Sequence, residues 1–174
     1  MRRVSGFTLI ESVIVIVVMG IAMLTITTFL APEISRSADP HYQTRASALG
    51  QSVMTQILSR NFDEHSGLQG GLPLCSASGE VACTALGDFG IDSGEDDNNP
   101  AAYNDVDDFE GCWEPLATNG CRDLNLLVGS NSYVNFRLDV AVTYAVPNQL
   151  KQINLKVTAS NQTPIDLHAY RGNY

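Results

Sequence analysis

The sequence predicts an α+β protein in which a long N-terminal helix precedes a C-terminal antiparallel sheet. Three observations support this fold class. An uncharged apolar run occupies residues 12–31, apolar residues recur at intervals of three and four between residues 40 and 61, and apolar and polar residues alternate after residue 133. The first two patterns are typical of helices, and the third is typical of strands that bury one face.

The apolar run is long enough to cross a membrane. Its twenty residues would span about 30 Å as a helix, which is the thickness of a bilayer core. A cleaved secretory signal is the alternative, but such signals have an apolar region of about 7–15 residues and a small-residue cleavage site. Arg2 and Arg3 precede the run. We therefore expect a single-pass inner-membrane anchor with its N-terminus in the cytoplasm and the rest of the chain outside.

A second helical segment is predicted at residues 40–61. Asp39 and Pro40 have the residue types of an N-cap and a first helical position. The face that would pack on a core consists of Tyr42, Ala46, Leu49, Val53 and Ile57. Pro32 and Pro40 predict a bend or interruption between this helix and the apolar run.

Three strands are predicted after residue 133. The even positions from Val134 to Val142 are apolar, and the same alternation returns at Ile153, Leu155 and Val157 and again at Ile165, Leu167 and Ala169. Turns are predicted at residues 147–149 and 161–164. Lys151, Asn154 and Lys156 are expected to face the solvent. The helix at 40–61 is the available cover for the apolar face of this antiparallel meander.

The four cysteines predict disulfides. An even number of cysteines after a membrane-targeting segment is typical of an oxidising compartment, and their spacing does not match the short Cys-x2-Cys pairs of structural zinc sites. Four cysteines allow three pairings, which the sequence does not decide. We favour the local pairing, in which Cys75 joins Cys83 and Cys112 joins Cys121, because it would order a segment rich in Gly, Asn, Asp and Ser.

Nine acidic residues lie between Asp88 and Glu110. Carboxylate oxygens are the ligands that Ca²⁺ prefers, so a calcium cofactor is one hypothesis, with Asp105, Asp107 and Asp108 as its ligands. The EF-hand pattern is absent. The alternative is a solvated acidic loop that keeps the protein soluble.

Charge and motif content exclude two function classes. The net charge of −9 argues against a nucleic-acid partner, because phosphate binding depends on clustered Lys and Arg. His41, His65 and His168 are scattered, and no hydrolase, zinc-protease or phosphate-loop motif is present. We therefore expect that the protein is not an enzyme.

The N-terminus resembles the prepilin signature of the type IV pilin-like family. The residues that carry the resemblance are Gly6-Phe7-Thr8-Leu9-Ile10-Glu11, after a short basic leader and before the apolar run. The resemblance implies that prepilin peptidase cleaves between Gly6 and Phe7, methylates the new amine of Phe7 and leaves the apolar helix in place. It also implies that Glu11 meets the amine of a neighbouring pilin during assembly, which would explain a carboxylate beside hydrocarbon.

The resemblance divides the chain into a leader at 1–6, a transmembrane and assembly helix at 7–31 and a periplasmic or extracellular pilin domain at 32–174. Two short stretches, at 103–109 and 169–174, are similar to MshD-type minor pilins of the mannose-sensitive haemagglutinin (MSHA) pilus. This similarity implies a minor pilin that acts in pilus initiation, assembly or tip formation and so in surface attachment. An adhesive module that binds a glycan or surface, and a type II secretion pseudopilin, are the alternatives.

Overall fold

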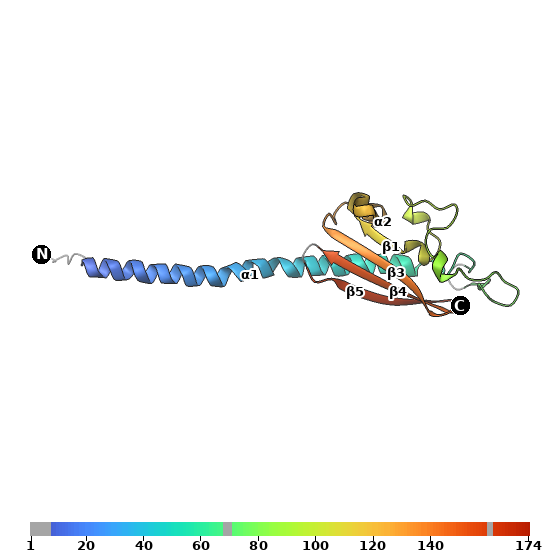
Figure 1. The fold of residues 1–174 in the computed structure, drawn as a ribbon, viewed down its shortest axis with the longest axis horizontal. Coiled ribbons are helices and arrows are strands. Elements are labelled where there is room, and N and C mark those ends of the chain that lie inside the picture. The colour runs from blue at the N-terminus through green and yellow to red at the C-terminus, as the bar shows by residue number, and fades with distance from the viewer. Residues whose placement is uncertain (1–7, 68–70, 160–161) are drawn as a thin grey trace. The chain divides into compact units, whose positions relative to one another are not determined.

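The computed structural model describes residues 8–67, 71–159 and 162–174, and the side chains of these residues except those at 31–40. The chain forms two compact units, Met1–His41 and Tyr42–Tyr174. Helix α1 spans Leu9–Leu58, and the strands follow it in the order shown in Figure 1. This is the predicted α+β fold.

The first part of α1 is an exposed apolar helix. Leu9–Leu30 is long and apolar enough to cross a membrane, and its large side chains are exposed in the isolated chain. Thr25, Thr27 and Thr28 each donate a hydroxyl hydrogen bond to a backbone carbonyl three or four residues earlier. These three hydroxyl groups are therefore satisfied within the helix, as a hydrocarbon environment requires.

Helix α1 continues through both prolines, so the helix start predicted at Asp39 and the interruption predicted between Pro32 and Pro40 are wrong. Proline removes one N–H donor, but its fixed φ of about −65° is compatible with helical backbone. The helix is stabilised on the far side of Pro40 by the apolar face that packs on the domain core. Tertiary packing therefore outweighs the local signal for a helix end.

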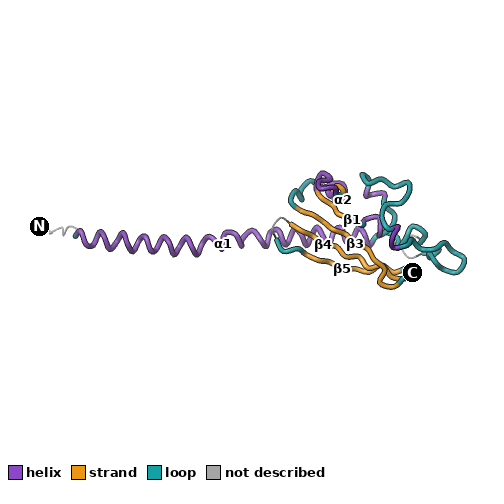
Figure 2. Tube along the Cα trace, viewed as in Figure 1, coloured by secondary structure: helices purple, strands orange, loops and turns teal. Residues whose placement is uncertain are grey.

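The sheet has the strand order β2-β1-β3-β4-β5. Strands β3 (Phe136–Val146), β4 (Leu150–Ala159) and β5 (Ile165–Gly172) form the predicted antiparallel meander. Two short strands were not predicted, namely β1 (Gly111–Glu114), which is antiparallel to β3, and β2 (Arg122–Asp123), which is parallel to β1. Figure 2 shows how loops dominate the chain between α1 and β1.

The domain core lies between α1 and the long strands. Ala46, Leu49, Val53 and Ile57 of α1 are buried with Leu138, Val140, Ile153 and Leu155 of the sheet, as the apolar spacing predicted. Gly50 marks a close approach, because an added Cβ would lie 2.5 Å from Leu167 Cδ1 and 3.0 Å from Val157 Cγ2. A side chain at position 50 would therefore require Leu167, and to a lesser degree Val157, to move.

A second part of the core comes from the segment between α1 and β3. Its buried side chains are Tyr103, Val106, Phe109, Trp113, Leu124 and Leu127. The Trp113 indole N–H donates to the carbonyl of Phe109 at 3.1 Å, and the short helix α2 (Leu124–Val128) begins after Asp123, whose side chain accepts from Asn125 N. Four 3₁₀ turns complete the segment at Leu86–Asp88, Pro100–Ala102, Asp107–Phe109 and Pro115–Gly120.

Candidate functional site

The predicted assembly residue Glu11 lies in the first turn of α1. Its backbone N–H donates to Thr8 Oγ1 at 3.4 Å, which places Thr8 and Glu11 in the Ncap and N3 positions of a capping motif. A carboxylate in this position is stabilised by the positive end of the helix dipole. The predicted cleavage and methylation positions, Gly6 and Phe7, lie outside the described residues.

Glu11 has no basic partner nearby in the sequence. Residues 8–35 contain no Lys, Arg or His. A counter-charge for Glu11 must therefore come from outside this helical segment, and the α-amine that the predicted cleavage before Phe7 would create is such a group. In a medium of low dielectric constant, a pair of this kind costs far less than an isolated carboxylate.

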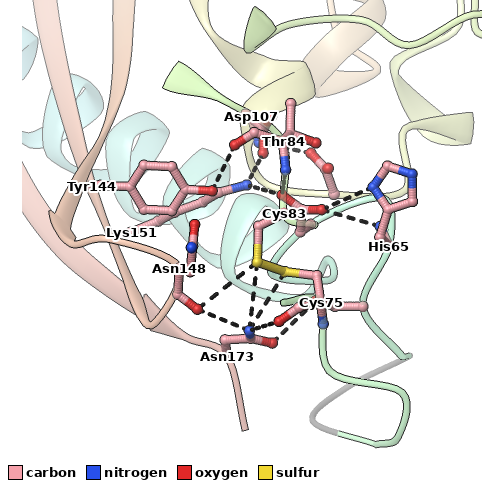
Figure 3. A network of polar contacts seen from close by, with 12 residues as sticks. His65, Cys75, Cys83, Thr84, Asp107, Tyr144, Asn148, Lys151 and Asn173 are labelled. Atoms are coloured by element: carbon pink, nitrogen blue, oxygen red, sulfur yellow. Dashed lines mark hydrogen bonds and ion pairs between the residues drawn. A yellow bond between two sulfur atoms is a disulfide. The ribbon is translucent and has the colours of Figure 1, made fainter. Parts of the chain in front are cut away.

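The four cysteines are joined in the local pairing, Cys75 with Cys83 and Cys112 with Cys121. The Asn173 side chain connects the first disulfide loop to the turn between β3 and β4, because its Nδ2 donates to the carbonyls of Cys75 at 3.0 Å and Asn148 at 2.9 Å (Figure 3). The second disulfide links β1 to the residue before β2. The first bridge therefore closes a loop that Asn173 ties to the β3–β4 turn, and the second holds a loop against β1.

A buried lysine forms the most concentrated polar cluster of the described domain. Lys151 on β4 is fully buried. Its Nζ contacts Asp107 Oδ1 and lies 3.1 Å from Asp63 Oδ2, with the rings of Phe62, Phe89 and Tyr144 centred 4.9, 4.6 and 5.7 Å from it. Figure 3 shows Lys151 and Tyr144 beside Asp107.

The prediction that Lys151 faces the solvent is wrong. Side chains alternate along a strand, so position 151 lies on the same face as Ile153, Leu155 and Val157. Asn154 and Lys156, on the opposite face, are half-buried and exposed respectively. The lysine is tolerated in the core because the Asp63 carboxylate neutralises it, Asp107 contacts it and the aromatic rings present their electron-rich faces to it.

Asp63 is held as a carboxylate. Its Oδ2 accepts from Thr84 N at 2.9 Å and its Oδ1 accepts from His65 N at 3.2 Å. Burial raises the pKa of Asp63, but the charge of Lys151 and these backbone hydrogen bonds outweigh it, so the pKa lies below its ordinary value.

Asp105, Asp107 and Asp108 are in the opposite situation. Burial raises the pKa of all three, to about 9 for Asp105, where Asp107 and Asp108 add repulsion, and to about 8 for Asp108. Asp105 Oδ1 accepts from the backbone N–H of Asp107 and Asp108, and Asp108 Oδ2 accepts from those of Asn104 and Asp105. These hydrogen bonds fold the segment into a tight turn around its own carboxyl groups.

The N-terminal part of the chain matches a known family model. Residues 1–27 match the family model described as the prokaryotic N-terminal methylation motif. The match supports a type IV pilin or pseudopilin. Comparison with curated proteins and with solved structures found no significant match. The motif implies processing by a prepilin peptidase, anchoring in a membrane and assembly with other pilins.

The structure brings together only two of the three predicted calcium ligands. Carboxylate oxygens of Asp105 and Asp107 lie within 4.8 Å of one another and of Asp63, a group that does not include Asp108. The Lys151 ammonium contacts two members of this group, so their charge is already balanced. All three predicted ligands are buried, and the solvated-loop alternative is therefore wrong for them, whereas it describes the exposed Asp88, Asp96 and Asp97.

Sequence reasoning missed Lys151 and Asp63 as partners of the acidic segment. The burial of Lys151 could have been predicted, because position 151 follows the same alternation as the apolar positions 153, 155 and 157 and therefore lies on the same strand face. No sequence pattern pointed to Asp63, since it lies in an irregular segment 88 residues before Lys151.

Proposed function

We propose that this chain is a minor pilin or pseudopilin, a structural subunit that enters a type IV fibre of the MSHA kind and acts in its initiation, assembly or tip formation. The observation that carries the proposal is the methylation motif joined to an α+β domain, with Glu11 in the first helical turn of an uncharged apolar stem. Surface attachment would follow from this role, because the domain would be displayed on the fibre.

The stem supplies both the anchor and the assembly signal. Before assembly, Leu9–Leu30 would hold the subunit in the inner membrane. Cleavage before Phe7 then creates an amine, and a neighbouring subunit's amine can meet Glu11 in the packed stems. The ion pair favours one register of side-by-side packing, because any other register leaves both charges without partners in hydrocarbon.

The domain would form on the outer side of that membrane. Arg2 and Arg3 favour a cytoplasmic N-terminus, and the two disulfides suit the oxidising periplasm. Loss of the leader would also make the net charge two units more negative, which favours solubility outside the membrane.

A Glu11→Val variant tests the pairing. We expect normal membrane insertion and normal processing, with N-methylated Phe7 as the mature N-terminus, because the apolar anchor is retained. Incorporation into sheared fibres should fall at least about tenfold, since an unpaired ion in this setting costs several kcal/mol and 1.4 kcal/mol corresponds to tenfold.

Ser12→Val is the matched control, because it adds a β-branched apolar residue at the neighbouring position and removes no charge. It should enter fibres as the wild type does. Equal incorporation of Glu11→Val and wild type would contradict the pairing mechanism, and a wild-type chain that keeps its leader and never joins a fibre would contradict the proposed function itself.

A further inference from the structure

The cluster around Lys151 has no part in the assembly of stems, and its composition is that of a reactive site. It contains an amine in contact with one carboxyl group, a second carboxylate 3.1 Å from the same amine and a third carboxyl group beside them. Lys151, Asp63 and Asp105 are fully buried and Asp107 is 2% exposed. An amine and a carboxyl group held together away from water are the two reactants of amide formation.

We propose that Lys151 and Asp107 condense into an intramolecular isopeptide bond between Nζ and Cγ, with Asp63 as proton acceptor and Asp105 as proton donor. Asp63 takes a proton from the ammonium, and the free amine attacks Cγ of Asp107 while Asp105 protonates a carboxyl oxygen. The N–C bond forms, one C–O bond of Asp107 breaks, and its oxygen leaves as water with the carboxyl proton of Asp107 and one proton that the ammonium supplied. Asp105 recovers its proton from the attacking nitrogen, Asp63 keeps the other ammonium proton, and nothing is oxidised or reduced.

The hydrogen bonds distinguish the electrophile from the base. The two oxygens of Asp63 accept backbone hydrogen bonds from His65 and Thr84 in addition to the contact with Lys151. These bonds stabilise the negative carboxylate, which is a poor electrophile and a suitable proton acceptor. Asp107 is 2% exposed, and burial disfavours its charged form, which leaves the neutral carboxyl group that an amine can attack.

Asp105 is placed to donate a proton. Its Oδ1 is occupied by two backbone N–H groups, whereas its buried Oδ2 has no hydrogen-bond partner among the described residues. A buried oxygen without a hydrogen-bond partner is costly when it carries charge, so Oδ2 is favoured as the site of a proton. A carboxyl oxygen of Asp105 lies within 4.8 Å of carboxyl oxygens of Asp63 and Asp107, close to the reacting groups.

The surroundings favour condensation over hydrolysis. Well-oriented intramolecular groups react as though present at about 10⁵–10⁸ M, and the rings of Phe62, Phe89 and Tyr144 keep water away from Nζ. Forming the amide also removes two opposite charges from a dry site, where each ion is costly. The product would connect β4 covalently to the turn that contains Asp107, across 44 residues of sequence, which would suit a subunit that bears tension in a fibre.

Peptide mapping of the mature full-length protein, purified in detergent and digested after reduction and denaturation, tests the proposal. We expect one peptide pair that joins the Lys151 and Asp107 segments and weighs one water less than the two peptides together. Trypsin should not cleave after Lys151, and an amine-reactive reagent should label Lys156 but not Lys151. The linked peptide pair should be absent from the Lys151→Arg variant. It should be present in the control variant Lys156→Arg, because Lys156 is exposed on the same strand.

Asp105→Asn tests the proton donor. Asparagine keeps the shape and neutrality of the protonated acid but not its acidity, so the folded variant should contain little of the linked pair while its near-ultraviolet circular dichroism stays unchanged. Recovery of Lys151 as a free, cleavable amine from wild-type protein kept folded for several days would overturn the proposal, whatever the variants do. Full linkage in Asp105→Asn would overturn the role of Asp105.

Discussion

At the scale of single residues, the charge balance of the domain depends on Lys151. Removing one partner of a buried ion pair costs more than the pair itself contributes, because the remaining charge has lost both water and its counter-ion. Here the remaining groups would be Asp63 and Asp107, which are 0% and 2% exposed. No other lysine among the described residues is buried in this way.

Lys151→Met should therefore destabilise the domain strongly. We expect the free energy of unfolding to fall by about 3–5 kcal/mol, which lowers the melting temperature by about 10 °C in a protein of this size. Thermal melts followed by circular dichroism measure this change. Lys156→Met is the control and should change the free energy of unfolding by less than about 0.5 kcal/mol. Equal melting temperatures for the two variants would show that the contacts of Lys151 do not stabilise the domain.

The pH dependence of stability belongs to Asp105 and Asp108. Their pKa values in the folded state, about 9 and about 8, exceed the unfolded value of about 3.9. The folded state therefore binds more protons than the unfolded state between these limits, and its stability falls as pH rises through this window. Asp63 contributes in the opposite sense, since its lowered pKa costs stability only at pH values below about 4.

We expect the melting temperature to fall by at least about 5 °C between pH 5 and pH 8 at constant ionic strength. Asp105→Asn should reduce this slope, because the amide stays neutral at every pH. A melting temperature that rises over the same interval would show that the carboxyl groups around Lys151 are ionised in the folded protein.

At the scale of elements, the fit between α1 and the sheet depends on a missing side chain. The helix approaches β4 and β5 so closely at Gly50 that a Cβ would contact Val157 and overlap Leu167. Glycine is a poor helix former, by about 1 kcal/mol relative to alanine, so its presence here is explained by packing and not by helix propensity. The two disulfides act at the same scale, because Cys75–Cys83 closes one loop and Cys112–Cys121 holds another against β1.

Gly50→Leu should separate α1 from the sheet. We expect a loss of about 1–3 kcal/mol from overpacking, in spite of the better helix propensity of leucine. Gln51→Leu places the same side chain one position further along, on the exposed face of α1, and should leave the urea midpoint nearly unchanged. If Gly50→Leu unfolds at the same urea concentration as wild type, the close approach is not a constraint on this interface.

At the scale of the whole molecule, the acidic character of the chain raises the question of a metal ion. The net charge is −9, and millimolar Ca²⁺ outside a cell would fill even a weak site. Calcium at Asp105, Asp107 and Asp108 stays a prediction from the sequence. Before any condensation with Asp107, the folded arrangement instead places the Lys151 ammonium as the cation of this cluster.

Melting curves with millimolar Ca²⁺ and with a chelator decide between these two cations. We expect the curves to coincide at fixed ionic strength, because the Lys151 ammonium already contacts Asp63 and Asp107 and would repel a second cation beside them. A rise of several degrees with Ca²⁺, absent with the same concentration of Mg²⁺, would establish a calcium site.

The sequence by itself determined the features that repeat along the chain. An apolar run without charges specifies a membrane-length stem, spacing of three and four specifies the packed face of α1, and alternation specifies β3, β4 and β5. Each pattern shows which face of a helix or strand is apolar and will be buried. That face can be predicted without knowing which element packs against it. The methylation motif is also local, because it lies within residues 1–27.

Only the tertiary structure decided what the irregular segment between α1 and β3 does. Asp63, Asp107 and Lys151 lie far apart in the chain and meet because the sheet and its loops bring them together. The short strands β1 and β2 and the buried Trp113 depend in the same way on neighbours that no local period announces. A charged side chain can be buried only where folding places a counter-charge beside it. A short stretch of sequence does not show which distant residue will lie there.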